Sequence, residues 1–160
     1  MPSRSNQIEK ERVCTPCSAG FFPEVATPPP PHRTLSDLSK IFIAPAVIEE
    51  ILFRAILLPC PTTTSKALSR SKLALWASGA LVAFVLYHHP LQTFISPRIL
   101  PVFSQPAFLT MATVLGVVCS GTYIVSRSLW PPIVIHWATV SVWYFKLGGY
   151  EKLVQGGYVS

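Results

Sequence analysis

The sequence predicts an all-α fold: a polytopic membrane helix bundle with about four core transmembrane helices, preceded by a disordered N-terminal segment. Hydrophobic residues make up 50% of the 160 positions and charged residues only 12%, against roughly 25% in ordinary soluble domains. The apolar residues gather in four runs, each close to the roughly 20 residues that span a hydrocarbon core. None of these runs alternates with period two, and in lipid only helices or closed barrels satisfy the backbone.

The predicted disordered segment covers residues 1–34. Pro28 to Pro31 form a short polyproline stretch, and few large apolar residues are available for a core. Cys14 and Cys17 form one isolated Cys-x-x-Cys. A zinc site would need a second ligand pair and a redox motif a βαβ context, so we interpret this spacing as chance.

The N-terminus is not a secretory signal, because no apolar stretch precedes residue 41 or so. A plastid or mitochondrial transit peptide is basic, serine-rich and poor in acids, and Glu9, Glu11 and Glu24 count against one without excluding it. We therefore expect an integral, multi-pass membrane protein of unknown organelle, with a plastid among the candidates.

The first helix is predicted at about Ile41–Leu58, before Pro59-Cys-Pro61. Ser36 or Ser39 is the expected N-cap. Pro45 lies inside the run and marks either the true start of the helix or a kink.

The other three helices are bounded by proline and glycine, which favour helix starts and ends respectively. They are expected at about Leu73–His89, Phe108–Val125 and Leu129–Leu147. The helical domain as a whole is predicted at 35–150, with a C-terminal tail at 151–160.

The net charge of +6 does not indicate nucleic-acid binding, because the basic residues form no stripe or patch. Lys66, Arg70 and Lys72 lie between two apolar runs, which favours a loop at a lipid headgroup surface. Membrane lipids are therefore expected partners, and nucleic acid is not. Basic residues on the two sides nearly balance, so orientation stays open.

Three charges interrupt the first apolar run: Glu49, Glu50 and Arg54. A charge at the centre of a membrane helix costs about 2.5 to 3.5 kcal/mol on the most lenient scale, so such a cluster indicates a functional site. The alternative is a surface-lying amphipathic helix, but Ile48, Ile51, Leu52 and Phe53 surround the charges on every side.

Two further runs carry histidines: His88 and His89 end the second, and His136 lies early in the fourth. One or two polar groups on each of several helices are typical of a site built between facing helices. The alternatives are a helix end at the membrane interface for the first pair and a structural bond between helices for His136.

Spacing separates the two glutamates. Glu50 and Arg54 are four residues apart on one helical face and can pair, whereas Glu49 is rotated by about 100°. Arginine can thus hold Glu50 ionised and leave Glu49 as a candidate general base. Phe84, four residues before His88, places a ring one turn from that imidazole.

These motifs resemble the CPBP family, the CAAX prenyl protease 2 and bacteriocin-processing (Abi) intramembrane proteases. The resemblance rests on Glu49-Glu50-x-x-x-Arg54, Phe84-x-x-x-His88 and His136 in that order, and covers roughly residues 41–147. It implies a peptidase of a membrane-bound or lipidated protein, with prenylated proteins among the candidate substrates. Glu49 would be the base, with His88 activating the water and His136 stabilising the oxyanion. Glu50 and Arg54 would orient the site.

No cofactor is expected. Glu49, His88 and His136 would be the ligands if the enzyme used zinc, but the resemblance also fits a metal-independent glutamate mechanism, which we favour.

Val140 departs from the pattern of the family, whose last motif usually has Asn four residues after the histidine. Thr139 can replace that second oxyanion donor only if its hydroxyl faces the site. The chain is also shorter than its relatives, which often have about eight helices. A catalytically impaired relative acting as a membrane scaffold or immunity factor is therefore the alternative. Intramembrane Glu and His also mark ion paths, so a small transporter is a third hypothesis.

Overall fold

The computed structural model describes residues 29–59, 69–88 and 100–155. Within these ranges the chain is mainly helical, with short connecting segments, and contains no strand, so the all-α prediction is confirmed. The interpretations of Cys14, Cys17, Cys60, Lys66 and His89 lie outside the described residues.

The first predicted helix begins earlier than expected and changes from α-helical to π-helical geometry along its length. A short 3₁₀ turn, η1 (Pro31–Arg33), leads into α2 (Thr34–Ile41), which runs on into the π-helical stretches η2 (Phe42–Glu49) and η3 (Ile51–Ile56). Pro45 lies inside η2, so the prediction that it starts the helix is wrong. A proline lacks the N–H that an α-turn requires, and π turns of this kind often accompany functional sites.

The expected serine cap is also wrong. Arg33 occupies the N-cap of α2 without a side-chain bond, and the Ser39 hydroxyl donates instead to the Leu35 carbonyl inside the helix. Because η1 already supplies the preceding turn, the first N–H groups of α2 do not depend on a serine.

The remaining predicted helices occur close to their expected positions. They are α3 (Arg70–Leu86), α6 (Pro106–Ser126) and α7 (Trp130–Lys146), joined by the short α5 (Leu100–Phe103) and followed by α8 (Gly149–Gln155). The predicted domain end at residue 150 thus falls inside α8. Arg70 and Lys72 are exposed in the first turn of α3, which Ser69 caps.

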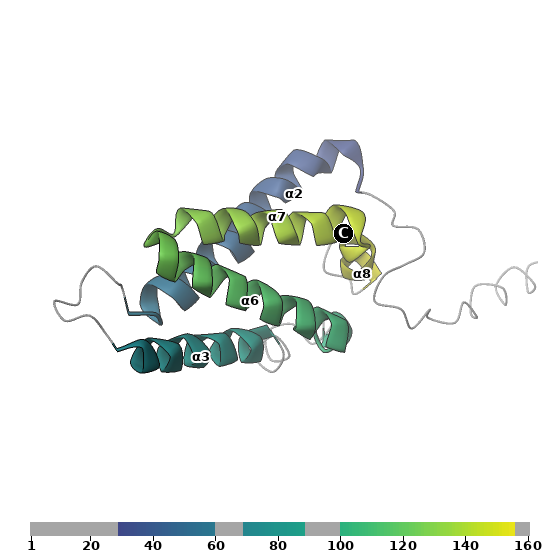
Figure 1. Ribbon diagram of the computed structural model, residues 1–160. Coiled ribbons are helices and arrows are strands. Elements are labelled where there is room, and N and C mark those ends of the chain that lie inside the picture. Colours follow the sequence, from purple (N-terminus) through teal and green to yellow (C-terminus); the bar gives the residue numbers. More distant parts are fainter. Residues whose placement is uncertain (1–28, 60–68, 89–99, 156–160) are drawn as a thin grey trace, which may run out of the picture.

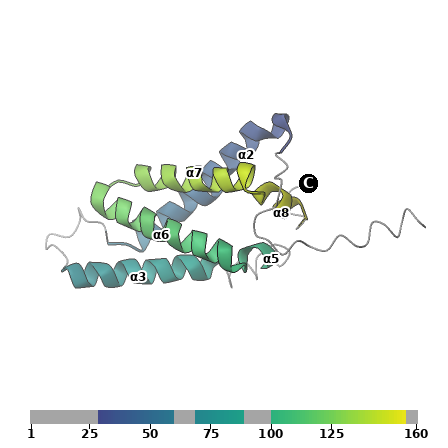
Figure 2. The same cartoon turned by 45° about the vertical axis from the view of Figure 1, so that its right-hand side comes forward.

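The helices are arranged in layers around α6. Figures 1 and 2 show α6 between α3 and α7, while α2 and its π-helical continuation cross α7. Gly116 permits the close approach of α3 to α6, since a Cβ there would lie 2.6 Å from Leu81 Cδ1 and 3.2 Å from the Phe84 ring. That approach places the end of α3 against the centre of the bundle.

Apolar side chains cover much of the outer surface. Ile43, Ile56, Leu75, Val125 and Trp130 are all more than half exposed, which suits lipid rather than water. In the described part of the chain, α6 is the one helix long and apolar enough to cross a membrane by length and composition. The multi-pass arrangement remains a prediction.

Candidate active site

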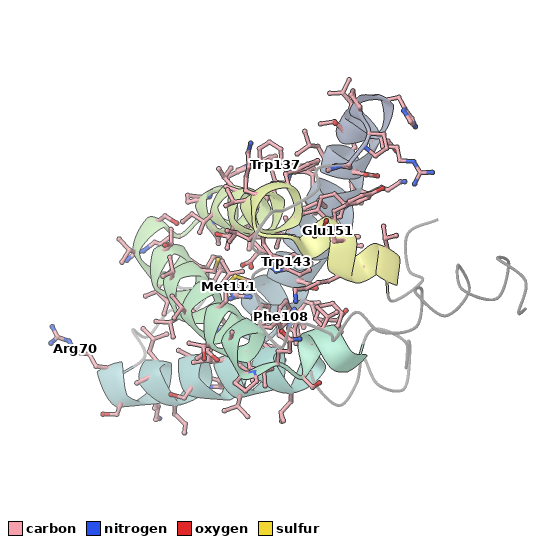
Figure 3. The ribbon with its side chains drawn as sticks, turned by 90° about the vertical axis from the view of Figure 1, so that its right-hand side faces the viewer. Arg70, Phe108, Met111, Trp137, Trp143 and Glu151 are labelled. Atoms are coloured by element: carbon pink, nitrogen blue, oxygen red, sulfur yellow. The ribbon has the colours of Figure 1, made fainter. Side chains whose placement is uncertain are left out.

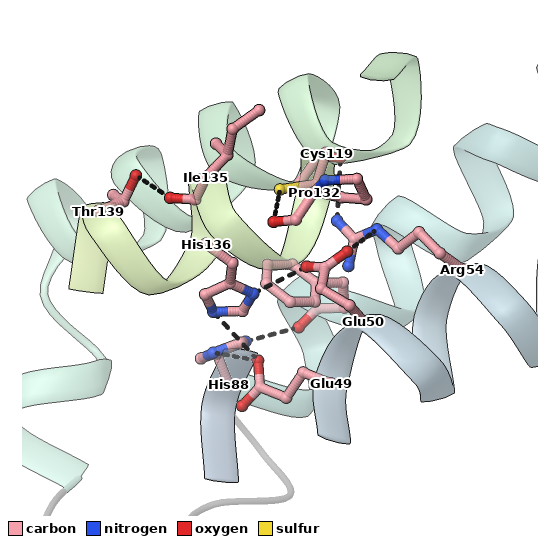
Figure 4. Close-up of polar contacts among 11 residues, drawn as sticks. Glu49, Glu50, Arg54, His88, Cys119, Pro132, Ile135, His136 and Thr139 are labelled. Carbon is pink, nitrogen blue, oxygen red and sulfur yellow. Dashed lines mark hydrogen bonds and ion pairs between the residues drawn. The ribbon is translucent and has the colours of Figure 1, made fainter. Parts of the chain in front are cut away.

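The five ionisable residues expected to form the site converge from four helical segments. Glu49 ends η2, Glu50 follows it, Arg54 belongs to η3, His88 lies two residues beyond the end of α3, and His136 lies in α7. Their exposed fractions are 6%, 0%, 1%, 8% and 1%, respectively. A surface-lying helix with solvated charges is therefore excluded, and so is a water-exposed helix end for His88. Figure 4 shows the five side chains together.

Glu50, Arg54 and the Nδ1 side of His136 form an inner cluster with the shorter contacts. Arg54 Nε lies 3.1 Å from Glu50 Oε2, and His136 Nδ1 lies 2.8 Å from Glu50 Oε1. Arg54 also donates from Nη2 to the Gly116 carbonyl at 3.1 Å, and its guanidinium lies 4.9 Å from the centre of the Phe84 ring. The spacing of four residues predicted this ion pair, whose charges compensate one another in the bundle interior.

Glu49, His88 and the Nε2 side of His136 form an outer cluster with longer contacts. Glu49 Oε2 lies 3.6 Å from His88 Nε2 and 3.8 Å from His136 Nε2. Both distances are longer than the donor–acceptor distance of a direct hydrogen bond. They suit groups that contact one water molecule in common. Glu49 Oε2 has no hydrogen-bond partner among the described residues.

The orientation of the His88 ring is determined by its own helix. His88 Nδ1 lies 2.9 Å from the Phe84 carbonyl, which can only accept, so Nδ1 carries the proton. The Phe84 ring packs against the imidazole at 4.6 Å and the Tyr87 ring at 5.3 Å. In the neutral ring, Nε2 is then an acceptor, and it points toward Glu49.

The outer cluster opens into a cavity of about 860 Å³. The cavity follows the α2 and η2 helix from Glu49 back to Asp37, and residues of α5, α6, α7 and α8 complete its walls. Many of the residues that line the cavity are aromatic or aliphatic: Phe84, Tyr87, Phe103, Phe108, Met111, Leu115, Val140, Trp143 and Leu153. A bulky, mainly apolar ligand with a few polar groups suits such a space.

Thr139 was a replacement donor only on the condition that its hydroxyl faced the site. Thr139 lines the cavity, but its hydroxyl donates to the Ile135 carbonyl of its own helix at 2.8 Å. Val140 lines the cavity with a side chain that cannot donate. His136 is therefore the one member of this α7 motif that presents a ring nitrogen to the outer cluster.

A zinc site would require several His, Cys, Asp or Glu side chains arranged around one ion. In the described ranges, no group of three or more His, Cys, Asp and Glu side chains is disposed to hold a metal ion. That the reaction needs no metal, with Glu49, His88 and His136 as the ligands if it does, stays a prediction.

Several polar residues near the cavity had escaped prediction. Asp37 is buried, accepts a hydrogen bond from the Tyr144 hydroxyl at 2.9 Å, and lies 3.6 Å from Lys40 Nζ. Trp143 lines the cavity with a buried indole. An aspartate just before an apolar run gives little signal by itself, because its partner is 107 residues away in the sequence.

Residues 32–142 match a family model described as Rce1-like, type II CAAX prenyl endopeptidase. No curated protein and no solved structure matches the chain. The matched range contains all five residues of the two clusters.

Proposed function

Because the chain belongs to the Rce1-like family of type II CAAX prenyl endopeptidases, a family of membrane proteases, we propose that it hydrolyses a peptide bond in a membrane-associated, prenylated protein. A CAAX substrate carries its lipid on a cysteine four residues from the C-terminus. The observation that carries this proposal is the convergence of Glu49 Oε2 on two imidazole nitrogens at the wall of a mainly apolar cavity.

Glu49 and His88 would bind and activate the water. Each presents an acceptor: the carboxylate oxygen and the unprotonated Nε2 lie 3.6 Å apart. A water about 2.8 Å from both atoms would donate one hydrogen to each, which leaves an oxygen lone pair for attack. The water oxygen bonds to the scissile carbonyl carbon as Glu49 takes its proton.

His136 would stabilise the oxyanion that this attack creates. Its Nδ1 proton is engaged by Glu50 at 2.8 Å, so Nε2 can donate to an oxyanion only when the ring carries a second proton.

Collapse of the tetrahedral intermediate would complete the reaction. The carbon–nitrogen bond breaks, and the proton held by Glu49 passes to the leaving amine. Products are a carboxylic acid on one fragment and an amine on the other, which together ionise to a carboxylate and an ammonium group, with Glu49 returned to its starting form. The only co-reactant required is water.

The test is cleavage of a farnesylated CAAX peptide by the full chain in liposomes. Wild type is expected to release the C-terminal fragment, and Glu49→Gln, which keeps the shape of the side chain, should lose about 10²- to 10⁴-fold in rate. Glu151→Gln on α8, outside the cavity wall, is the matched control and should keep the wild-type rate. Equal cleavage by Glu49→Gln and wild type would refute the mechanism.

Absence of cleavage by wild type, together with specific binding of membrane proteins, would instead favour the impaired relative. Val140 is the observation behind that alternative, because it leaves the α7 motif without its second donor.

A further inference from the structure

Trp143 carries a buried hydrogen-bond donor. Its side chain is 4% exposed and lines the same cavity as the outer cluster. Within the described parts of the chain, no group accepts a hydrogen bond from its Nε1. A buried N–H left unpaired destabilises the fold, and such groups in native structures call for a specific explanation.

The indole is held in place from two sides. The Phe108 ring packs edge-on at a centroid distance of 5.8 Å, and Figure 3 shows Trp143 inside the bundle near Phe108 and Met111. On the other side, a Cβ at Gly149 would lie 2.8 Å from Cδ2 and Cε3 of the indole. Gly148, at φ 78°, makes the turn that brings Gly149 there. The benzene edge therefore faces the α8 backbone, and the Nε1 edge lies opposite.

A second indole in this helix, that of Trp137, behaves differently. Trp137 donates from Nε1 to the Leu38 carbonyl at 3.2 Å and ties α7 to α2. Trp137 is not part of the cavity wall. The fold thus supplies an acceptor for the indole of Trp137, which connects two helices. The described residues supply none for the indole of Trp143, which lines the cavity.

Trp143 shares a helical face with His136. Seven residues separate them, which is almost two full turns, and the rise of an α-helix places them about 10 Å apart along the axis. An extended peptide advances about 3.3 to 3.6 Å per residue. A substrate whose scissile carbonyl lies at His136 therefore brings another main-chain oxygen to Trp143 about three residues away.

We propose that the Trp143 indole N–H binds a main-chain oxygen of the substrate about three residues from the scissile bond and fixes the register of the peptide in the cavity. This role rests on the proposed peptidase function. The acceptor is either an amide carbonyl or the terminal carboxylate of the peptide, two sources of the same oxygen chemistry.

The test measures the affinity of peptide analogues for the full chain in detergent, with Glu49→Gln as the background to prevent turnover. In the probe, a farnesylated CAAX peptide, each amide is replaced in turn by an (E)-alkene, and in one further analogue the terminal carboxylate becomes an alcohol. Each analogue is measured against Trp143, against Trp143→Phe, and against a protein with benzothienylalanine at 143, where sulfur replaces the N–H with little change in shape.

One analogue is expected to bind about 3- to 10-fold more weakly than the parent peptide when Trp143 is present. That penalty should vanish in both modified proteins, which themselves bind the parent more weakly by the same factor. Trp137→Phe, which removes a different indole N–H of the same helix, is the matched control and should retain the full penalty. The position of the sensitive analogue tells whether an internal carbonyl or the chain end is bound.

Penalties that are identical with and without the N–H at position 143 would overturn the proposal, and so would failure of the parent peptide to bind. If wild type cleaves the peptide but the analogue penalties do not depend on the N–H at position 143, only the role of Trp143 is refuted. Coupling in the binding assay without cleavage refutes the peptidase function and leaves the peptide-binding role intact.

Discussion

The inner and outer clusters share one imidazole but differ in how completely their charges are paired. Glu50 bonds to His136 at 2.8 Å and pairs with Arg54 at 3.1 Å, whereas the closest approaches of Glu49 to the two histidines are 3.6 and 3.8 Å. Both carboxylates are buried. The proposed mechanism therefore gives adjacent residues of one type unequal tasks: the paired Glu50 would hold the geometry, and Glu49 would react with water.

The contrast predicts that the inner cluster governs stability. Arg54→Met keeps an unbranched side chain but leaves Glu50 ionised without compensation, so we expect a loss of about 3 to 5 kcal/mol in the free energy of unfolding. Denaturant unfolding in detergent measures this. Arg54→Met with Glu50→Gln should recover part of the loss, because the uncompensated charge is gone. An Arg54→Met protein as stable as wild type would contradict the assignment.

A smaller effect is expected where α2 meets α7. Tyr144→Phe removes the hydroxyl that donates to Asp37 at 2.9 Å, and a hydrogen bond to a charged group contributes about 1.5 to 3 kcal/mol. Unfolding should require less denaturant by that amount, while the turnover number stays within about twofold because the pair does not belong to either cluster. A large fall in turnover at unchanged stability would place Tyr144 in the reaction instead.

The oxyanion stabilisation proposed for the outer cluster can be tested by adding a hydrogen-bond donor. Val140→Asn supplies an amide N–H₂ one turn from His136, and we expect roughly a tenfold rise in turnover. Removal of a native oxyanion donor costs about 10² to 10³, and the gain is smaller since this cavity has not been shaped around the new amide. Val140→Leu is the control of similar size without a donor. No gain with Val140→Asn would indicate that the oxyanion forms elsewhere.

The smallest expected effect is that of a chelator. If Glu49 activates water without a metal, dialysis against EDTA should leave the cleavage rate unchanged. Loss of activity that added zinc restores would show that Glu49, His88 and His136 serve as ligands, contrary to the proposed mechanism.

The helices were predictable where the chain marks them clearly. Pro106 and an uninterrupted apolar run fixed α6 to within two residues at the start and one at the end. The pairing of Glu50 with Arg54 was also readable, because it depends only on positions in one helix.

The early part of the first helix was not predictable. A local reading of Pro45 suggested a start or a kink, whereas the helix continues through it in wide π turns. The course of the helix through Pro45 depends on the packing of η2 against α7, and the local sequence does not indicate that packing.

Contacts between distant residues were equally hidden. The bond of Asp37 to Tyr144 and the unpaired indole of Trp143 depend on how α2, α6 and α8 lie against α7. The five ionisable residues were identifiable by their energetic cost in apolar runs, but their division into two clusters required knowledge of which way each ring nitrogen points.

The most direct test of this division compares Glu49→Gln with Glu50→Gln in one set of assays, measuring cleavage of the farnesylated CAAX peptide and the free energy of unfolding for each. Glu49→Gln should abolish most cleavage while the protein remains as stable as wild type, and Glu50→Gln should lower stability strongly by depriving buried Arg54 of its partner. Glu49→Gln that cleaves normally, or Glu50→Gln that remains fully stable, would contradict the account.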